Sequence, residues 1–201
     1  MGKEVKTNAV RILERNKVPY ELLTYECDEF IDGIHSAEAT GTPVAQTYKT
    51  LVMQGKSKKY YVFVIPIAEE VDLKAAARAV SEKSVEMIHV KDLTAITGYV
   101  RGGCSPLGMK KAFPTVIDAS ARQYSEIYVS GGRIGTSIRL DPQDLARIVR
   151  AGSMPPVSGN GRSPAPFAKP RFQRSPLLRS SFCSFLGAPF VCSCKQIFMQ
   201  A

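Results

Sequence analysis

The feature that most constrains the fold is a pair of β-rich runs separated by a short polar segment. Residues 47–53 (TYKTLVM) and 60–67 (YYVFVIPI) are dominated by β-branched, aromatic and other apolar side chains, and strands favour the β-branched and aromatic types. Between them lies GKSKK, a polar sequence that contains a glycine. Two strand-like runs joined by such a segment predict a β-hairpin. We therefore expect a sheet that is largely antiparallel or mixed.

Helices are predicted on both sides of this hairpin. Apolar residues in the segment 5–16 recur on one helical face. Residues 73–80 (LKAAARAV) are strong helix formers that follow Asp72, a favourable N-cap. Further helices are expected at 35–40, with Ser36 as N-cap, and at 91–98 and 143–150, and further strands at 20–25, 115–118, 126–130 and 134–140. Because the elements show no regular βαβ alternation, the predicted fold class is α+β, with helices around a mixed sheet.

The chain changes character after about Ala151. Residues 152–176 are rich in Gly, Pro, Ser and Arg and have no apolar periodicity, a composition that predicts disorder. All 18 acidic residues lie in residues 1–150, which carry a net charge of +3, whereas residues 151–201 carry +6. The positive net charge of the whole chain therefore gives no reason to assign nucleic-acid binding to the folded part. We expect one domain over residues 1–151 and a disordered or non-homologous basic tail over residues 152–201.

Composition also bears on the compartment and on cofactors. The sequence has no run of about 18 apolar residues, as a membrane span requires. Its N-terminal segment lacks the apolar core of a signal peptide. The five cysteines are odd in number and scattered, which fits neither a disulfide framework nor a zinc site. We therefore expect a cytoplasmic protein with no metal, no other cofactor and no membrane partner.

A glycine-rich loop over residues 99–111 (YVRGGCSPLGMKK) is the first candidate functional site. Its notable residues are Gly102, Gly103, Pro106, Gly108, Lys110 and Lys111. Glycines let the backbone approach a ligand closely, and proline stiffens the loop. Successive backbone N–H groups in such a turn can bind an anion or a developing oxyanion. A phosphate, carboxylate or oxyanion site is one interpretation, and a surface turn with a basic rim is the other.

Lys49 is the second candidate, because it interrupts an apolar strand. Alternation along the strand places Lys49, Leu51 and Met53 on one face. Since Leu51 and Met53 are expected to face the core, Lys49 points inward or lies at the rim of the core. A desolvated lysine can orient a carbonyl or stabilise an oxyanion. A lysine that extends from a strand end toward solvent is the alternative.

Other polar residues are weaker candidates. Cys104 lies in the glycine loop, but no histidine lies close in sequence to favour its thiolate. His35 and His89 are isolated and are more typical of packing or surface residues. Asp118 follows a predicted strand and could line the same cleft.

Six segments occur in an order that supports a family assignment. They are KTLV at 49–52, VFVIP at 62–66, GGCSPLGMKK at 102–111, TVIDAS at 115–120, IYVSGGRIG at 127–135 and DPQDL at 141–145. The set resembles the YbaK/EbsC family of free-standing aminoacyl-tRNA deacylases, relatives of the editing domain inserted in bacterial prolyl-tRNA synthetases. The resemblance covers residues 4–150 and not the tail. It implies a partly barrel-like sheet and a cleft for the aminoacyl-adenosine end of tRNA.

The resemblance also implies an activity. The expected enzyme is a trans-editing deacylase that removes a mischarged amino acid, above all cysteine from Cys-tRNA(Pro), with Cys-tRNA(Cys) as a second substrate. In the cysteine-removing branch the thiol of the substrate attacks its own ester carbonyl, so the enzyme needs no nucleophile. The implied partners are the aminoacylated 3′ end of tRNA and, transiently, prolyl-tRNA synthetase.

The implied site residues fall into three groups. Lys49 takes the place of the family's key lysine, and the backbone of Gly102 and Gly103 lies where the family holds the reacting carbonyl or the ribose. The residues expected to contact the substrate are Thr50, Ser105, Ser130 and Ser137. Those expected to contact tRNA are Arg101, Lys110 and Lys111. Phosphate contacts of this kind provide affinity without sequence selectivity.

One position departs from the family pattern. Some cysteine-specific members carry an acidic residue where this chain has Ser137. The amino acid that is removed is therefore less constrained than the fold. The alternatives are a deacylase for another small amino acid, such as alanine, and a non-catalytic module that binds aminoacyl-tRNA or a synthetase.

Overall fold

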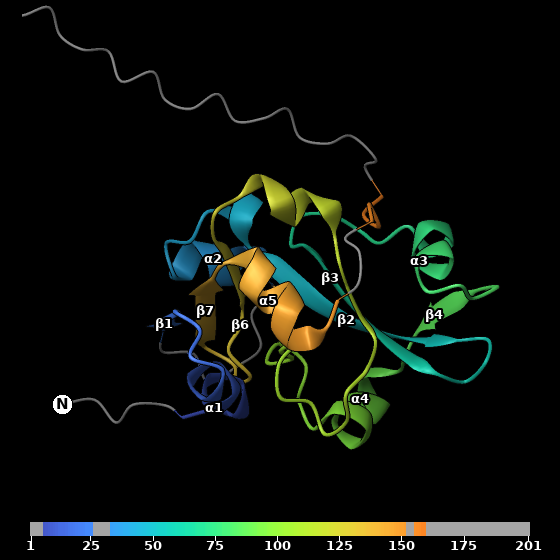
Figure 1. Cartoon of the computed structure of the whole chain (residues 1–201), viewed down its shortest axis with the longest axis horizontal. Helices are drawn as coiled ribbons and strands as arrows, with labels where there is room; N and C mark the ends of the chain where they lie inside the picture. The colour runs from blue at the N-terminus through green and yellow to red at the C-terminus, as the bar shows by residue number, and fades with distance from the viewer. Residues whose placement is uncertain (1–5, 26–32, 152–154, 160–201) are drawn as a thin grey trace, which may run out of the picture. The chain divides into compact units, whose positions relative to one another are not determined.

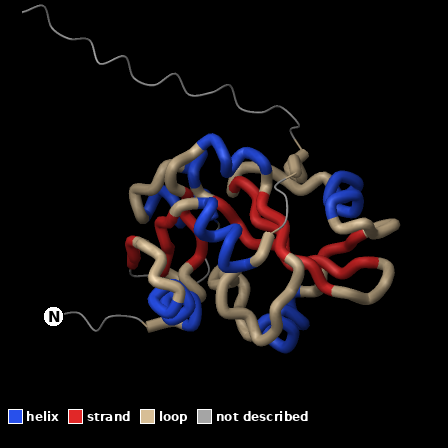
Figure 2. Tube along the Cα trace, in the orientation of Figure 1, coloured by secondary structure: helices blue, strands red, loops and turns tan. Residues whose placement is uncertain are grey.

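The computed structural model describes residues 6–25, 33–151 and 155–159 (Figure 1 and Figure 2). The chain divides into two units, Met1–Phe167 and Ala168–Ala201. The second unit lies outside the described residues, as does most of the segment for which the sequence predicts disorder. Over the described ranges, no helix is both long and apolar enough to cross a membrane.

Seven strands and five α-helices make up the described part of the chain. The strands are β1 (Glu21–Thr24), β2 (Tyr48–Gly55), β3 (Tyr60–Pro66), β4 (Val85–Met87), β5 (Thr115–Ile117), β6 (Ile127–Ser130) and β7 (Thr136–Leu140). The α-helices are α1 (Asn8–Arg15), α2 (Gly33–Ala39), α3 (Leu73–Ala79), α4 (Val90–Thr97) and α5 (Pro142–Val149). Two short 3-10 helices are η1 (Val44–Gln46) and η2 (Ala119–Gln123).

The strands form two sheets that meet beside β2. One sheet has the strand order β4-β2-β3-β5 and the other has the order β1-β7-β6. All neighbouring strands are antiparallel except β3 and β5, which are parallel. An isolated bridge between Thr47 and Tyr128 connects the two sheets. The predicted α+β class with a mixed sheet is confirmed, and the described strands form an open arrangement rather than a closed barrel.

The predicted hairpin is confirmed as β2 and β3, the long pair of strands in Figure 1 whose outer end lies beside β4. Their pairing runs from Tyr48 opposite Pro66 to Gln54 opposite Tyr60. The turn between them is tight enough that Lys58 adopts a φ of 65°. Non-glycine residues with positive φ occur mostly in such turns.

The helix caps at Asp72 and Asp141 follow from local sequence. The Asp72 carboxylate accepts hydrogen bonds from the backbone N–H groups of Lys74 and Ala75, and Asp141 accepts one from Gln143. Each satisfies amide groups that a helix leaves unpaired at its N-terminus. Helices α3 and α5 therefore begin close to where the sequence predicts.

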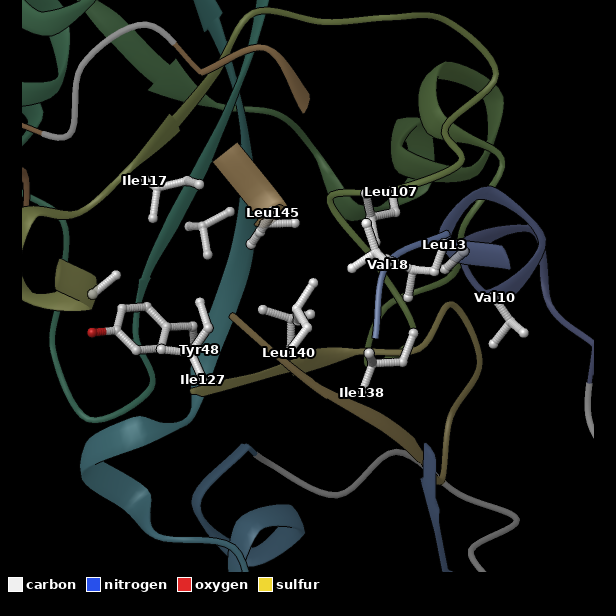
Figure 3. Close-up of a cluster of buried hydrophobic side chains, with 14 residues drawn as sticks. Val10, Leu13, Val18, Tyr48, Leu107, Ile117, Ile127, Ile138, Leu140 and Leu145 are labelled. Carbon is white, nitrogen blue, oxygen red and sulfur yellow. The ribbon is translucent and has the colours of Figure 1, made fainter. Parts of the chain in front are cut away.

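The largest buried cluster lies between the two sheets and against α1 and α5 (Figure 3). It contains Leu13 from α1, Leu145 from α5, Ile117 from β5 and Ile138 from β7, all fully buried. Burying one such side chain stabilises the fold by about 1.5–3 kcal/mol. Because successive residues of a strand point to opposite faces, Ser137 points away from this core. The face of β6 and β7 that carries Ser137 is thus left for other contacts.

Two predicted features differ from the structure. Helix α2 begins at Gly33, so Ser36 lies within the helix and its prediction as N-cap is wrong. The reason is that Ile34 and His35 already have helical backbone. Strand β4 has no counterpart among the predicted strands. With three residues it is too short to show the alternation of apolar and polar side chains that predicts a strand. It forms by pairing with the end of β2.

Described residues beyond the expected domain end at 151 also pack against the domain. Pro155–Gly159, which we call the C-terminal strap, packs against the domain. Val157 is fully buried in an apolar cluster with Met53 and Phe63. The backbone of the strap pairs with residues 70–72, because Asp72 N–H donates to the Val157 carbonyl at 2.9 Å and an isolated bridge links Val71 with Ser158. Composition concealed this strap because its neighbours are rich in Gly, Pro and Ser.

Asp118 anchors the strap through its carboxylate. This side chain is 2% exposed. Its Oδ2 accepts hydrogen bonds from the backbone N–H groups of Val157 and Ser158 at 2.7 and 3.0 Å, and its Oδ1 accepts one from Ser120 at 2.9 Å. Asp118 therefore holds the strap and does not line the candidate site.

Candidate active site

A cavity of about 450 Å³ lies between β2, the glycine loop and the β6–β7 hairpin. Its lining comes mainly from residues 47–51, from Arg101, Gly102 and Cys104, and from residues 129–130 and 134–137. Small-molecule sites have volumes of roughly 300–1,000 Å³. The structure therefore brings Lys49 and the glycine loop, which are far apart in sequence, to one cavity of suitable size.

Lys49 is half-buried at the start of β2. Alternation along the strand is as predicted, since Leu51 and Met53 pack in one apolar cluster while Tyr48 and Val52 pack on the other face. The Lys49 ammonium donates one hydrogen bond, to the Ile67 carbonyl at 3.1 Å. An ammonium has three donors. Two of its protons thus have no acceptor among the described residues and are available to a ligand.

Two opposing effects determine the pKa of Lys49. Burial lowers its pKa from the ordinary lysine value of 10.5, while the negative charges of Glu70 and Glu69 act to raise it. The burial effect is the larger, so the pKa of Lys49 is lowered overall. Desolvation also strengthens the interaction of the ammonium with a developing oxyanion, because the local dielectric is lower than in water.

Thr50 presents a buried hydroxyl without a partner. Its Oγ1 is shielded from solvent and makes no hydrogen bond within the described part of the chain. Thr50 lines the cavity beside Lys49. Buried polar atoms are nearly always hydrogen-bonded, and an exception calls for a specific explanation. A ligand in the cavity supplies such an explanation only if its binding exposes this hydroxyl, which is shielded in the described structure.

The glycine loop contributes backbone to the cavity. Gly102 lines it with a φ of 83°, a left-handed conformation that glycine adopts without strain. Gly103 is not part of the lining. A Cβ atom at Gly103 would lie 3.1–3.2 Å from backbone atoms of Arg133 and Ile134. The absence of a side chain at Gly103 therefore lets the loop pack directly against the turn between β6 and β7.

Cys104 lines the cavity but is poorly suited to act as a nucleophile. Its side chain is buried, and this burial raises the pKa of the thiol to about 12, against a smaller lowering effect of a hydrogen bond with Thr97. The thiolate is the nucleophilic form of cysteine. At neutral pH the Cys104 thiol is therefore protonated.

Ser130 and Ser137 meet on one face of the β6–β7 hairpin. The two residues are paired opposite one another, and both line the cavity. The Ser130 hydroxyl accepts a hydrogen bond from the Gly132 backbone N–H at 3.4 Å. Ser105, by contrast, is fully buried inside the glycine loop, where its hydroxyl accepts a hydrogen bond from Leu107 N–H at 3.3 Å. Ser105 therefore lies outside the cavity lining, and its expected substrate contact has no support in the structure.

The three basic residues expected to contact tRNA do not lie together. Arg101 lines the cavity. The Lys110 ammonium donates to the backbone carbonyls of Thr94 and Ala95 at 3.1 and 3.4 Å, which places it at the C-terminal end of α4. Lys111 lines a separate groove. Of the three, Arg101 alone is placed to act at the cavity itself.

Residues that the sequence did not single out complete the site. Tyr25, Ile34 and Thr47 line the cavity. The Tyr25 backbone N–H donates to the Gly135 carbonyl at 2.9 Å, which ties the end of β1 to the β6–β7 turn. Strand alternation could have pointed to Thr47, two residues before Lys49, but no pattern indicates Tyr25 or Ile34. Within the described ranges, no three His, Cys, Asp or Glu side chains are grouped so as to hold a metal ion.

Comparison with known proteins agrees with this geometry. The sequence pattern of the aminoacyl-tRNA editing domain matches residues 34–148. A relative from Enterococcus faecalis, named "Putative Cys-tRNA(Pro)/Cys-tRNA(Cys) deacylase EbsC", is 48% identical over 141 residues. The match covers 70% of this chain and 86% of the relative.

Solved structures share the fold at lower sequence identity. One, titled "Crystal structure of a putative trans-editing enzyme for prolyl tRNA synthetase", has a TM-score of 0.66 and 22% identity, and the match covers 77% of this chain and 99% of that one. A hypothetical protein has a TM-score of 0.68 and 19% identity, with coverage of 76% and 99%. On the family pattern and the 48% identical relative, the chain belongs to the YbaK/EbsC family of aminoacyl-tRNA editing domains.

Proposed function

We propose that this protein is a trans-editing deacylase that removes cysteine from mischarged Cys-tRNA(Pro), and also from Cys-tRNA(Cys). The observation that carries the proposal is that Lys49 and Gly102 both line one cavity of about 450 Å³. The relative named as a Cys-tRNA deacylase supports the choice of substrate. The cavity has room for an aminoacyl group and part of the terminal adenosine.

In this reaction the nucleophile comes from the substrate. The cysteine thiol loses its proton, and its sulfur bonds to the ester carbonyl carbon. The bond between that carbon and the ribose oxygen then breaks, and the ribose oxygen takes up a proton, which leaves tRNA and a cysteine thiolactone. The protonated state of Cys104 fits this scheme, because no thiolate of the enzyme is then needed.

Lys49 and the glycine loop have distinct roles in the proposal. The oxyanion that forms on the ester carbonyl is stabilised by the free protons of the Lys49 ammonium, which the Ile67 carbonyl orients. The backbone around Gly102 holds the ester or the ribose beside it. Loss of one oxyanion donor typically lowers a rate by about 10²–10³.

The test uses the full chain with Cys-tRNA(Pro), Ala-tRNA(Pro) and Pro-tRNA(Pro) as substrates. We expect release of cysteine alone, and a rate lower by about 10²–10³ in Lys49→Ala. Lys74→Ala, which removes an exposed lysine of α3, is the matched control and should retain the native rate. Full activity in Lys49→Ala would contradict the proposal. Cys104→Ser should stay active, and its inactivity would indicate an enzyme thiol as nucleophile.

Two alternatives have their own outcomes in this test. Selective release of alanine would keep the deacylase class and change the amino acid, in line with a serine at position 137 where some cysteine-specific relatives have an acid. Binding of a non-hydrolysable aminoacyl-adenosine without turnover of any substrate would favour a binding module. The observation behind this second alternative is that, among the described residues, the cavity lining includes no histidine or carboxylate to serve as a general base.

A transient complex with prolyl-tRNA synthetase in the cytoplasm is part of the same proposal. An isolated editing domain with few base-reading contacts needs another source of tRNA selectivity, and a synthetase that holds the same tRNA would supply it. Deacylation of Cys-tRNA(Pro) should then accelerate when the synthetase is added, and deacylation of Cys-tRNA(Cys) should not. Equal rates with and without the synthetase would remove this part of the proposal.

A further inference from the structure

A second concave surface lies on the other side of the glycine loop. It encloses about 640 Å³ between the C-terminal turns of α1 and α5 and residues 106–113, and it shares no lining residue with the first cavity. Its floor is largely apolar and includes Ile12, Leu107, Met109, Phe113, Ile148 and Val149. Three cationic residues, Arg15, Lys111 and Arg150, complete the surface, which we call the basic groove.

The charges of the basic groove are not neutralised by the protein. Arg15, Lys111 and Arg150 are exposed, and none of them forms an ion pair in the described part of the chain. Over the described ranges, the lining contains no aspartate or glutamate. The nearby Arg147, by contrast, pairs with Asp144 at 2.6 Å. The groove is therefore a concentrated positive site in a domain whose net charge is small.

Arg150 occupies a position that glycine would fill more easily. It caps the C-terminus of α5 with a φ of 54°, in the left-handed region. Glycine is the usual residue at such a position because it has no side-chain clash there. A cation near a helix C-terminus is favourable in itself, which accounts in part for Arg15 and Arg150. Lys111 lies in the loop and has no such explanation.

The two cavities meet at the glycine loop. Arg101, Gly102 and Cys104 line the first, and Pro106 begins the lining of the second. Since consecutive Cα atoms are about 3.8 Å apart, those of Cys104 and Pro106 are at most about 8 Å apart. A chain-like ligand whose end occupies the first cavity could thus continue around the loop to the second.

We propose that the basic groove binds the phosphodiester backbone of the tRNA acceptor arm while the aminoacylated 3′ end occupies the first cavity. This inference rests on the proposed function. Three cations that form no ion pair within the described residues, in a groove whose described lining has no acid, complement a polyanion, and contacts of this kind do not depend on base sequence. The groove thereby adds affinity for tRNA without taking part in the chemical step.

Binding of uncharged tRNA to the full chain tests the groove directly. The variants Arg15→Gln, Lys111→Gln and Arg150→Gly are compared by fluorescence anisotropy between about 50 and 200 mM salt. We expect each to reduce the slope of log affinity against log salt by about one, a change equal to about a fourfold effect over this salt range. Lys74→Gln, on α3 and outside both cavities, should leave the slope unchanged.

The variant Arg150→Gly distinguishes an effect on tRNA binding from an effect on the stability of the fold. Because glycine suits the left-handed position, this variant should unfold at the same or a higher urea concentration while it binds tRNA less tightly. A loss of stability together with normal tRNA binding would overturn the assignment. So would an equal change of slope in Lys74→Gln, because the effect would then belong to the overall charge.

A short substrate distinguishes failure of the groove from failure of the proposed function. Cysteine esterified to adenosine alone is too short to reach the groove. Groove variants should cleave it at the native rate and show a raised KM with unchanged kcat on Cys-tRNA(Pro). Slower cleavage of the short ester would overturn the groove proposal.

If the native chain cleaves neither substrate yet the groove variants lose tRNA binding, the proposed function fails and the groove proposal stands. Weaker binding of polyglutamate with unchanged tRNA binding would assign the groove to an acidic protein instead.

Discussion

Lys49 and Thr50 are adjacent residues of β2 whose polar groups are incompletely paired within the described structure, since the Lys49 ammonium makes one hydrogen bond and the Thr50 hydroxyl makes none. Burial lowers the pKa of the Lys49 ammonium, and the Thr50 hydroxyl has no hydrogen-bond partner in the described structure. Both features disfavour the folded state, since an unsatisfied buried polar group costs about 1–3 kcal/mol. Residues of this kind are expected where function, rather than stability, selects the side chain.

Thr50→Val should therefore change stability and activity in opposite directions. Valine has nearly the same shape, so the variant removes the unpaired hydroxyl and should raise the free energy of unfolding by about 1 kcal/mol. Deacylation should fall because the hydrogen bond to the substrate is lost. Urea unfolding and the rate of cysteine release measure the two effects.

Thr42→Val is the matched control for this experiment. Thr42 is a buried threonine, and its hydroxyl donates to the Ala37 carbonyl at 3.2 Å. Its replacement should lower stability, since the Ala37 carbonyl loses a partner. If both variants destabilise the protein equally, the Thr50 hydroxyl forms a hydrogen bond in the folded protein.

The pH dependence of deacylation should report the charge of Lys49. If the ammonium stabilises the oxyanion, kcat/KM falls as the pH rises through the lowered pKa of Lys49, which lies below the ordinary 10.5. Lys49→Arg should extend activity to higher pH, because a guanidinium stays charged. The rates are corrected for uncatalysed ester hydrolysis. If kcat/KM falls at the same high pH in the native protein and in Lys49→Arg, the fall reports the titration of a group other than Lys49.

The lowered pKa of Lys49 also changes how the stability of the protein depends on pH. Between the folded-state pKa of Lys49 and the unfolded value near 10.5, the unfolded chain binds more protons than the folded protein. Stability therefore rises with pH in this window as far as Lys49 is concerned, and the unfavourable burial of the charge is fully present at lower pH.

Much of the site at residue scale could be predicted from sequence. Strand alternation predicts that Lys49 points toward the core or its rim, and the resemblance of the ordered motifs points to Thr50 and Ser130, all of which line the cavity. Ser105 and Lys110 belong to the same motifs and yet turn away, toward Leu107 and the end of α4. The difference arises because the direction of a loop side chain depends on tertiary packing, which has no periodicity for the sequence to display.

The elements of the fold differ in how far their own sequence determines them. The β2–β3 hairpin and the caps at Asp72 and Asp141 depend on neighbours within a few residues, and they form as predicted. The C-terminal strap depends on Asp118, about 40 residues earlier in the chain. Contacts over such a separation leave no local pattern, so a segment rich in Pro and Gly conceals the strap.

Asp118→Ala should release the strap from the domain. The change removes the acceptor of three backbone N–H groups, and bonds to charged groups are the stronger class, so a loss of about 3 kcal/mol of stability is expected. Amide hydrogen exchange should accelerate at Val157 and Asp72. Asp141→Ala, which removes an exposed N-cap with one such bond, should cost about 1 kcal/mol and leave those amides protected. Equal losses in the two variants would contradict the anchoring role of Asp118.

At the scale of the whole domain, the candidate site is a property of how the two sheets meet. Lys49 and Thr50 come from one sheet and Ser130 and Ser137 from the other, and the isolated bridge between Thr47 and Tyr128 lies where they approach. The glycine loop closes the third side. The site residues come from several elements, so the order of the motifs along the chain predicts the site, whereas the overall composition does not.

The strap also determines when the domain can be completed during synthesis. Asp118 precedes Pro155 by 37 residues, which at a translation rate of about 5–20 residues per second corresponds to an interval of about 2–7 seconds. Throughout this interval the nascent domain has an apolar cluster without Val157, a carboxylate without two of its amide partners, and an unpaired backbone edge at residues 70–72. Each newly made chain thus passes through an incomplete state in which a chaperone, or the same edge of another nascent chain, can bind in place of the strap.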